Sequence, residues 1–144
     1  MEVSVIIVNY NTITLLRECL ISIYKQTKDV TFEVIVSDND SMDGSVEMLK
    51  TEFPEVIILK NEKNLGFGVA NDRALKKAKG KYIFYLNSDT ILKNNAIKIF
   101  FDYWEKSDDK QEIGAIGSNL LDINGKIACS YGVFPTEGNQ FKSL

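Results

Sequence analysis

KYIFYLNSDT, residues 81–90, is an apolar run of strand-forming residues that ends abruptly in polar ones. An unbroken apolar run of this length is typical of a β-strand buried on both faces, as in a parallel sheet. Three earlier runs have the same pattern: VSVIIVNYN (3–11), FEVIVSDND (32–40) and VIILKN (56–61). The sequence therefore predicts four buried strands.

The segments between and after these strands carry apolar residues at helical spacing. They predict four helices: one capped by Asn11 or Thr12, one from its N-cap Asp43 to about Phe53, one from Phe67 stopped by Gly80, and one around Trp104. Alternating strands and helices indicate an α/β fold, with a mostly parallel sheet and right-handed crossovers. Residues 113–134 read instead as shorter strands with a hairpin at Asn124-Gly125.

Composition restricts the classes of function. The 144 residues are 44% apolar and 26% charged, which suits one folded domain. No apolar run is long enough to span a membrane, Met1-Glu2-Val3-Ser4 lacks the start of a signal peptide, and two cysteines do not make a disulfide scaffold, so we expect a cytoplasmic location. A net charge of −3 argues against nucleic acid as a partner, and the absence of histidine excludes Ser-His-Asp catalysis and histidine-based metal sites.

Polar clusters follow all four predicted strands. In open α/β sheets, ligands bind beyond the carboxyl ends of the strands, so four such clusters at one edge predict a binding site. The clusters are Asn9-Tyr10-Asn11, Ser37-Asp38-Asn39-Asp40, Asn61 with Asn64, Gly66 and Gly68, and Asn87-Ser88-Asp89.

Three of these side chains have a functional and a structural interpretation. Asp38 ends a buried strand and can accept hydrogen bonds from a nucleobase or ribose, or it can stabilise a turn. Tyr10 can stack on a base or pack at the sheet edge. Asp89 can bind a divalent cation together with substrate phosphates, or cap the segment that follows.

At these residues the sequence resembles the family 2 glycosyltransferases of the GT-A fold, especially the rhamnosyltransferase-like branch. The similar segments, from Val3 to about Pro135, are VSVIIVNYN, VSDNDSMDGS, NEKNLGFGVANDRAL, YLNSDT at the position of the DxD motif, and GAIGSNLLDINGKI. The resemblance implies a GT-A donor-binding domain over residues 1–144 that is incomplete at its C-terminus. It also implies transfer of a sugar, with inversion, from a nucleotide diphosphate to an acceptor hydroxyl, in surface polysaccharide or glycan synthesis.

The resemblance also implies roles for individual residues. Asp89 is placed on a Mn²⁺ or Mg²⁺ ion, Tyr10 and Asp38 at the nucleobase, and Gly66 with Asn71 near the phosphates. Asn87 replaces the first aspartate of DxD, a change that the rhamnosyltransferase-like branch often tolerates. The complete set of residues expected to bind the nucleotide sugar is Val8, Asn9, Tyr10, Asp38, Asn39, Asn64, Gly66, Asn71, Asn87 and Ser88.

The family's general base lies well beyond DxD, so we expect it beyond Leu144, and we expect this chain alone to bind a donor without appreciable transfer. The implied acceptor is a saccharide or a lipid-linked saccharide, with the full-length protein peripheral at the inner face of the membrane, and self-association into a homo-oligomer is a further expectation. Two alternatives stay open. One is a nucleotide-binding module without transfer activity. The other is a nucleotidyltransferase, for which Asn9-Tyr10-Asn11-Thr12 lacks the early Gly-rich, Lys/Arg-containing signature.

Overall fold

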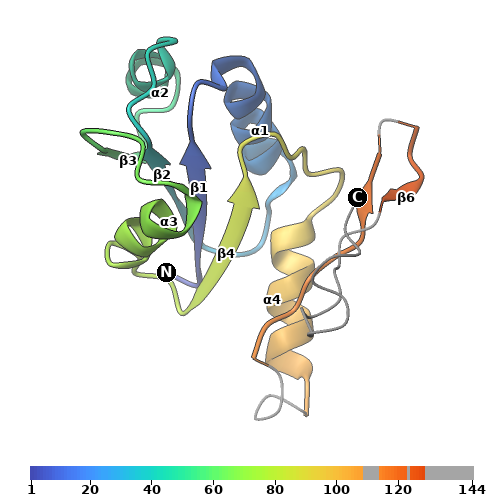
Figure 1. Ribbon diagram of the computed structural model, residues 1–144. Coiled ribbons are helices and arrows are strands. Elements are labelled where there is room, and N and C mark those ends of the chain that lie inside the picture. Colours follow the sequence, from blue (N-terminus) through green and yellow to red (C-terminus); the bar gives the residue numbers. More distant parts are fainter. Residues whose placement is uncertain (109–113, 123, 129–144) are drawn as a thin grey trace, which may run out of the picture. The chain divides into compact units, whose positions relative to one another are not determined.

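The computed structural model describes residues 1–108, 114–122 and 124–128 (Figure 1). The chain divides into two compact units, residues 1–108 and 109–144. The first unit contains the sheet and its helices. In the second, β5 (Leu120–Leu121) and β6 (Ile127–Ala128) pair antiparallel. The turn between them contains Asn124 and Gly125, so the predicted hairpin is confirmed.

Four parallel strands form the sheet of the first unit. They are β1 (Val3–Asn9), β2 (Phe32–Asp38), β3 (Ile57–Lys60) and β4 (Tyr82–Asn87), in the order β3-β2-β1-β4. All four match the apolar runs of the sequence, and the prediction of a parallel α/β sheet is confirmed. The register pairs Asn9 with Asp38, and Val8 with both Ser37 and Asn87. The polar residues that end these strands therefore meet at one edge of the sheet.

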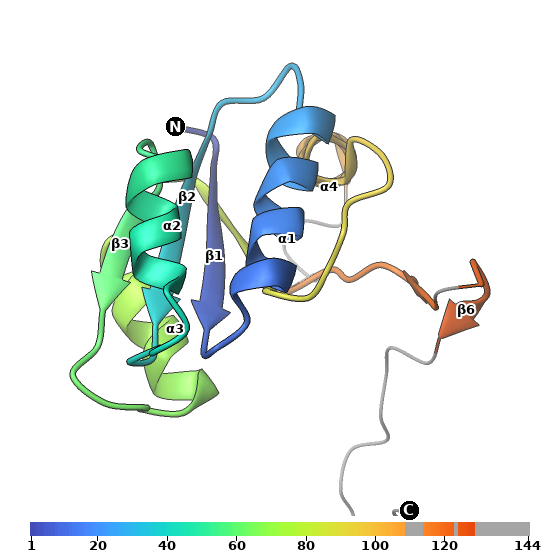
Figure 2. The ribbon, with the colours of Figure 1, turned by 90° about the horizontal axis from the view of Figure 1, so that it is seen from above.

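Helices cover both faces of the sheet (Figures 1 and 2). They are α1 (Ile13–Gln26), α2 (Ser45–Glu52), α3 (Phe67–Leu75) and α4 (Ala96–Lys106). Odd-numbered residues of β1, such as Val5 and Ile7, belong to a core that includes residues of α1, α2 and α4. Ile6 points to the other face and forms a smaller core with Ile35 and Ala74 of α3. The alternation of side chains along β1 thus separates the two layers of helices.

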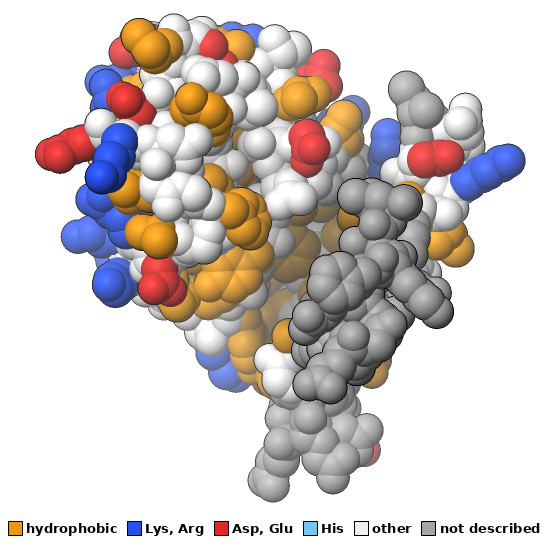
Figure 3. Space-filling model, in the orientation of Figure 1, with side chains coloured by type: hydrophobic (Ala, Val, Ile, Leu, Met, Phe, Trp, Pro, Cys, Tyr) orange, Lys and Arg blue, Asp and Glu red, His pale blue; other side chains and the backbone are white. Residues whose placement is uncertain are grey.

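The layer that contains α3 leaves apolar side chains exposed. Figure 3 shows hydrophobic side chains gathered over α3 and β4 on the viewed face. Tyr85 of β4 is 52% exposed, and Phe67 and Val69 of α3 are 61% and 54% exposed. In the other layer, aromatic residues of α4 pack on β4: Phe101 and Trp104 contact Tyr82, and Phe100 contacts Phe84.

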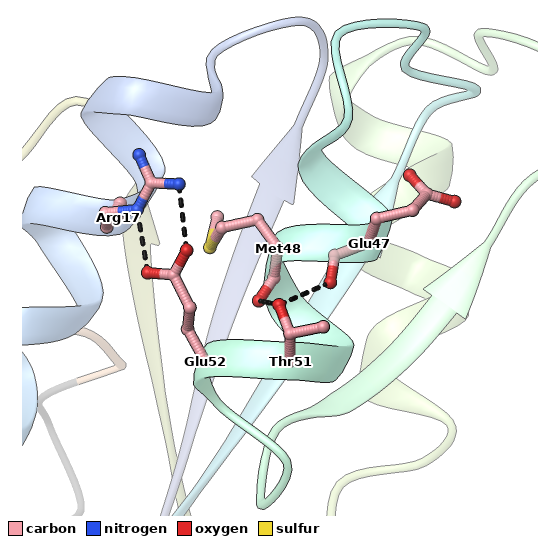
Figure 4. Close-up of polar contacts among 5 residues, drawn as sticks. All are labelled: Arg17, Glu47, Met48, Thr51 and Glu52. Carbon is pink, nitrogen blue, oxygen red and sulfur yellow. Dashed lines mark hydrogen bonds and ion pairs between the residues drawn. The ribbon is translucent and has the colours of Figure 1, made fainter.

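An ion pair joins α1 to α2 at the surface (Figure 4). Arg17 donates from Nε and from a terminal nitrogen to the two carboxylate oxygens of Glu52, at 2.8 and 3.0 Å. Nearby, the hydroxyl of Thr51 donates back to the carbonyl of Glu47 within α2. Because both partners of the ion pair are partly exposed, packing of the apolar faces contributes more to the contact between these helices than the ion pair does.

Two local predictions are wrong. The N-cap of α2 is Gly44, whose φ of 88° lies in the left-handed region, rather than Asp43. The helix α3 ends at Leu75 with Lys76 as its C-cap, so Gly80 does not terminate it. Gly80 instead lies against β1, where an added Cβ would be 2.3 Å from the backbone nitrogen of Ser4. The glycine is required by this close approach of two backbones.

Within the described residues, we find no helix with the length and apolar content needed to span a membrane.

Candidate functional site

A pocket of about 390 Å³ lies at the carboxyl ends of the strands. This is the edge of the sheet where an α/β fold binds its ligands. Residues from all four strand-end segments contribute to the wall: Val8, Tyr10, Thr12, Asn39, Asn64, Gly66, Phe67, Asn87, Ser88 and Asp89. Eight of the eleven predicted site residues are in this set, and Asn9, Asp38 and Asn71 are not.

Asn9 and Asp38 are fully buried behind the pocket rather than facing it. Asn9 donates from Nδ2 to Oδ2 of Asp38 at 2.7 Å, and Oδ1 of Asp38 accepts the backbone N–H of Ser41 at 2.9 Å. Both carboxylate oxygens of Asp38 therefore have protein partners, as the turn-stabilising interpretation expects. This pair holds the loops after β1 and β2 together.

The same hydrogen bonds extend to the pocket wall. Oδ1 of Asn9 accepts the hydroxyl of Thr12 at 2.6 Å, and that hydroxyl lies 3.1 Å from the hydroxyl of Ser88. Thr12 is the N-cap residue of α1, but its side chain makes no capping hydrogen bond. The carboxylate of Asp43 accepts the N–H of Ile13 instead, at 2.8 Å. The side chain of Thr12 is thus directed toward β4 and not toward its own helix.

Glycine and asparagine form the wall at the start of α3. The side chain of Asn64 accepts the N–H of Gly66 at 2.9 Å, and Gly66 has a φ of 77°. This left-handed conformation favours glycine at the turn into α3. Asn71 lies one turn further along, where its amide donates to the carbonyl of Phe67 at 3.1 Å; it is a half-buried helix residue outside the pocket wall.

Two aromatic rings line the pocket, Tyr10 at 49% and Phe67 at 61% exposure. Aromatic rings with exposed faces can stack on a planar ligand. Tyr10 is predicted from the sequence as a site residue, whereas Phe67 and Thr12 are not. Phe67 reads as part of an apolar helix face and Thr12 as a cap, so neither has a signal that separates it from a structural residue.

Asp89 supplies the only carboxylate among the described residues of the pocket wall. No group of three or more Cys, Asp or Glu side chains able to hold a metal ion occurs within residues 1–108, 114–122 and 124–128. The oxygens of Asp89, Asn87 and Ser88 suit a hard cation that takes its remaining ligands from phosphate and water. The donor set therefore fits a Mn²⁺ or Mg²⁺ ion bound together with a diphosphate, and does not form a closed protein cage.

A buried thiol lies below this end of the pocket. Sγ of Cys19 in α1 is 3.7 Å from the carbonyl oxygen of Asn87. Burial, and secondly the negative charge of Asp89, raise the pKa of the Cys19 thiol to about 12. The thiol therefore stays protonated near neutral pH and is a packing group rather than a nucleophile.

Residues 4–134 match the family model for glycosyl transferase family 2. The chain belongs to this family. It is 30% identical over 131 residues, 88% of its length, to the poly(ribitol-phosphate) beta-glucosyltransferase of Bacillus spizizenii. Among solved structures, S. aureus TarS 1-349 in complex with UDP superposes with a TM-score of 0.67 at 28% identity, over 74% of this chain. The mannosyltransferase PcManGT from Pyrobaculum calidifontis, in complex with GDP-Man and Mn²⁺, gives 0.64 at 25% identity, also over 74% of this chain.

These family 2 relatives are much longer than the part that matches. The match covers 20% of the B. spizizenii protein, 32% of the TarS chain and 33% of the PcManGT chain. The fold of the matched part is the GT-A fold, as the sequence predicts.

Three described carboxylates after Asp89, those of Asp102, Glu105 and Asp122, make contacts within the protein. Asp102 pairs with Lys98, and burial opposes but does not outweigh this contact, which lowers the pKa of Asp102. Glu105 accepts from Lys81 and from the hydroxyl of Tyr82, and Asp122 accepts two backbone N–H groups in its turn. Asp109, Glu112, Glu137 and the rest of the segment 129–144 lie outside the described residues.

Proposed function

We propose that this pocket binds the nucleotide diphosphate of an activated sugar, and that the chain is the donor-binding part of an inverting glycosyltransferase. The observation that carries the proposal is that Asp89, Tyr10 and Asn39, from three strand ends, line one pocket. A carboxylate for a cation, a ring for a base and an amide for hydrogen bonding are the groups that such a ligand needs.

The spacing of the strands suits a nucleotide. Asp89 follows β4 and Asn39 follows β2, with β1 between them. Two inter-strand spacings of about 4.8 Å separate β4 from β2 by roughly 10 Å, which is comparable with the distance from a diphosphate to its base. We therefore assign the phosphates to the β4 end and the base to the β2 end, where the ring of Tyr10, which follows the neighbouring strand β1, would stack on it.

The Asp89 end would hold a Mn²⁺ or Mg²⁺ ion with the help of Asn87 and Ser88. Such an ion stabilises the negative charge of a departing diphosphate. The hydroxyl of Ser88, 3.1 Å from that of Thr12, is available to donate to a phosphate oxygen, because the hydroxyl of Thr12 already donates to Asn9. The buried Asn9–Asp38 pair would keep Thr12 in place, so we assign Asn9 and Asp38 an indirect role and Asn71 none in direct binding.

The relatives support a nucleotide-sugar donor without identifying it. The TarS structures contain UDP or UDP-GlcNAc, and the PcManGT structure contains GDP-Man and Mn²⁺. The relative from B. spizizenii is named as acting on poly(ribitol-phosphate). By this similarity we propose a role in polysaccharide synthesis, with a saccharide or lipid-linked saccharide as acceptor, and a general base that is not part of the described pocket.

The test is isothermal titration calorimetry with UDP and GDP, with Mn²⁺ or with EDTA. We expect binding of at least one nucleotide, and at least tenfold weaker binding in EDTA, which is about 1.4 kcal/mol. Asp89→Asn should remove the dependence on metal. Asp29→Asn is the matched control, because Asp29 precedes β2 at the opposite end of the sheet and its φ of 59° is one that asparagine tolerates. Absence of nucleotide binding would refute the donor proposal, and equal affinity with and without EDTA would refute the metal assignment.

A further inference from the structure

The orientation of the Asn39 carboxamide is fixed by backbone groups. Its Oδ1 accepts the backbone N–H of Leu65 at 3.4 Å, and its Nδ2 donates to the backbone carbonyl of Gly66 at 3.4 Å. A backbone N–H can only donate and a carbonyl can only accept, so the oxygen and nitrogen of this amide cannot be exchanged without losing both contacts. The side-chain oxygen of Asn39 therefore points toward the backbone N–H of Leu65.

Asn61 reinforces this orientation from below. Its backbone N–H donates to the carbonyl of Asp38 at 2.8 Å, and its Nδ2 donates to Oδ1 of Asn39 at 2.9 Å and to Oγ of Ser37 at 3.1 Å. Asn61 is completely buried, and its own Oδ1 has no partner within the described residues. An unpaired buried acceptor such as this Oδ1 is unfavourable for stability. The favourable contribution of the Asn61 side chain therefore comes from the two hydrogen bonds that its Nδ2 donates.

The nitrogen of Asn39 is consequently the group left for a ligand. Asn39 is only 2% exposed but, unlike Asn9 and Asp38, it lines the pocket, and its Nδ2 carries two hydrogens, of which the Gly66 carbonyl accepts at most one. Its Oδ1 already accepts from Asn61 and Leu65. The side chain therefore offers an N–H donor to the pocket and not an acceptor.

We propose that Asn39 selects donor nucleotides whose base carries a carbonyl oxygen on its distal edge, and that Asn61 is the positioning residue that sets this preference. The inference rests on the proposed function, which places the base at the β2 end. Uracil and guanine present an exocyclic oxygen at this edge, whereas cytosine and adenine present an amino group. An amino group there would face the N–H of Asn39, donor against donor.

The test compares the affinities of UDP and CDP, and of GDP and ADP, by calorimetry in Mn²⁺. For the unmodified chain we expect at least tenfold tighter binding of UDP than of CDP, and of GDP than of ADP wherever purines bind. Asn39→Asp keeps an oxygen toward Asn61 and Leu65 but replaces the outward donor by an acceptor, so the preference should disappear or reverse. The added negative charge acts on both nucleotides of a pair and cancels in the ratio.

Asn61→Ala tests the positioning role. Without Nδ2 of Asn61, the Asn39 amide keeps only its two long backbone contacts, and we expect the UDP-to-CDP ratio to fall below about threefold. Ser37→Ala is the matched control, because it removes the other partner of Asn61 but retains the contact with Asn39, and the ratio should stay as in the unmodified chain. Should Asn61→Ala fail to fold, Asn61→Leu, which has a similar volume but no N–H donor, tests the same role and should lower the ratio in the same way.

The outcomes separate this inference from the proposed function. Nucleotide binding with a ratio near one in the unmodified chain, or a ratio that Asn39→Asp leaves unchanged, would overturn the base preference and leave donor binding intact. An unchanged ratio in a folded Asn61→Ala variant would overturn the role of Asn61. Absence of binding by all four nucleotides would overturn both proposals together.

Discussion

Replacing Gly80 by alanine should strongly destabilise the fold. The new Cβ would be 2.3 Å from the backbone nitrogen of Ser4 and 2.6 Å from the carbonyl carbon of Val3. An ordinary contact begins at 3.4 Å, so one of the two backbones must move by about 1.1 Å. Ser4 cannot move easily, because β1 is an interior strand whose register pairs Ser4 with Glu33 on one side and Ile83 on the other.

The expected loss lies at the upper end of the range for overpacking, about 3 kcal/mol. The hydrogen bond from the Gly80 N–H to the Ser4 hydroxyl, 2.8 Å long, would be strained by the same displacement. A loss of this size is a large fraction of the 5–15 kcal/mol that typically stabilises a domain. It corresponds to a fall in Tm of roughly 10 °C.

Urea unfolding followed by the fluorescence of Trp104, the single tryptophan of the chain, measures this loss. Gly68→Ala is the matched control, because nothing lies within 4 Å of the added Cβ and the position is helical. That variant should be as stable as the unmodified chain or slightly more stable, by up to about 1 kcal/mol. A loss of less than about 1 kcal/mol for Gly80→Ala would refute the argument that β1 is held rigidly.

Two further predictions concern ionisable groups. Burial opposes ionisation of Asp43, but hydrogen bonds from Ser45 and Ile13 outweigh it and lower the pKa of the carboxyl. Asp43→Ala, which removes these hydrogen bonds, should therefore lower the free energy of unfolding by about 1 kcal/mol near neutral pH. Because a depressed native pKa stabilises the fold above the unfolded pKa of about 3.9, urea titrations should show this difference vanish as pH falls through the native pKa, and a difference independent of pH would contradict the assignment. In a Cys129→Ser background, Cys19 should resist a thiol reagent at mildly alkaline pH until urea unfolds the protein, because burial raises its pKa to about 12, and rapid labelling of the native protein would contradict its burial.

The sheet could be predicted from the sequence because burial on both faces leaves a simple pattern. Each of the four apolar runs became a strand, and each polar run after it became a loop at the same edge. The end of α3 could not be predicted in the same way. Gly80 looks like a helix terminator in the local sequence, and its contact with Ser4, 76 residues away, becomes visible only when β1 and the start of β4 lie side by side.

In the candidate site, too, some features could be predicted from the local sequence and others depend on contacts between distant residues. Tyr10, Asn39 and Asp89 could be placed together because the carboxyl ends of parallel strands meet. The burial of Asn9 and Asp38 depends on their facing each other in the register of β1 and β2, which the sequence does not display. Asn61 stands among the polar residues after β3, but its role depends on contacts with residues of the β2 end. A residue type indicates what chemistry is available, whereas the strand order decides which groups reach a ligand.

All residues of the pocket wall lie between Val8 and Asp89, so a single continuous stretch of chain encodes the candidate donor site. Within the described residues, the chain after Asp89 contributes nothing to this wall. Recombination that joins a different C-terminal portion after α4, whose residues complete the core under β4, would therefore preserve the pocket. In evolution, the nucleotide pocket and the part of the protein joined after it can therefore change independently of each other.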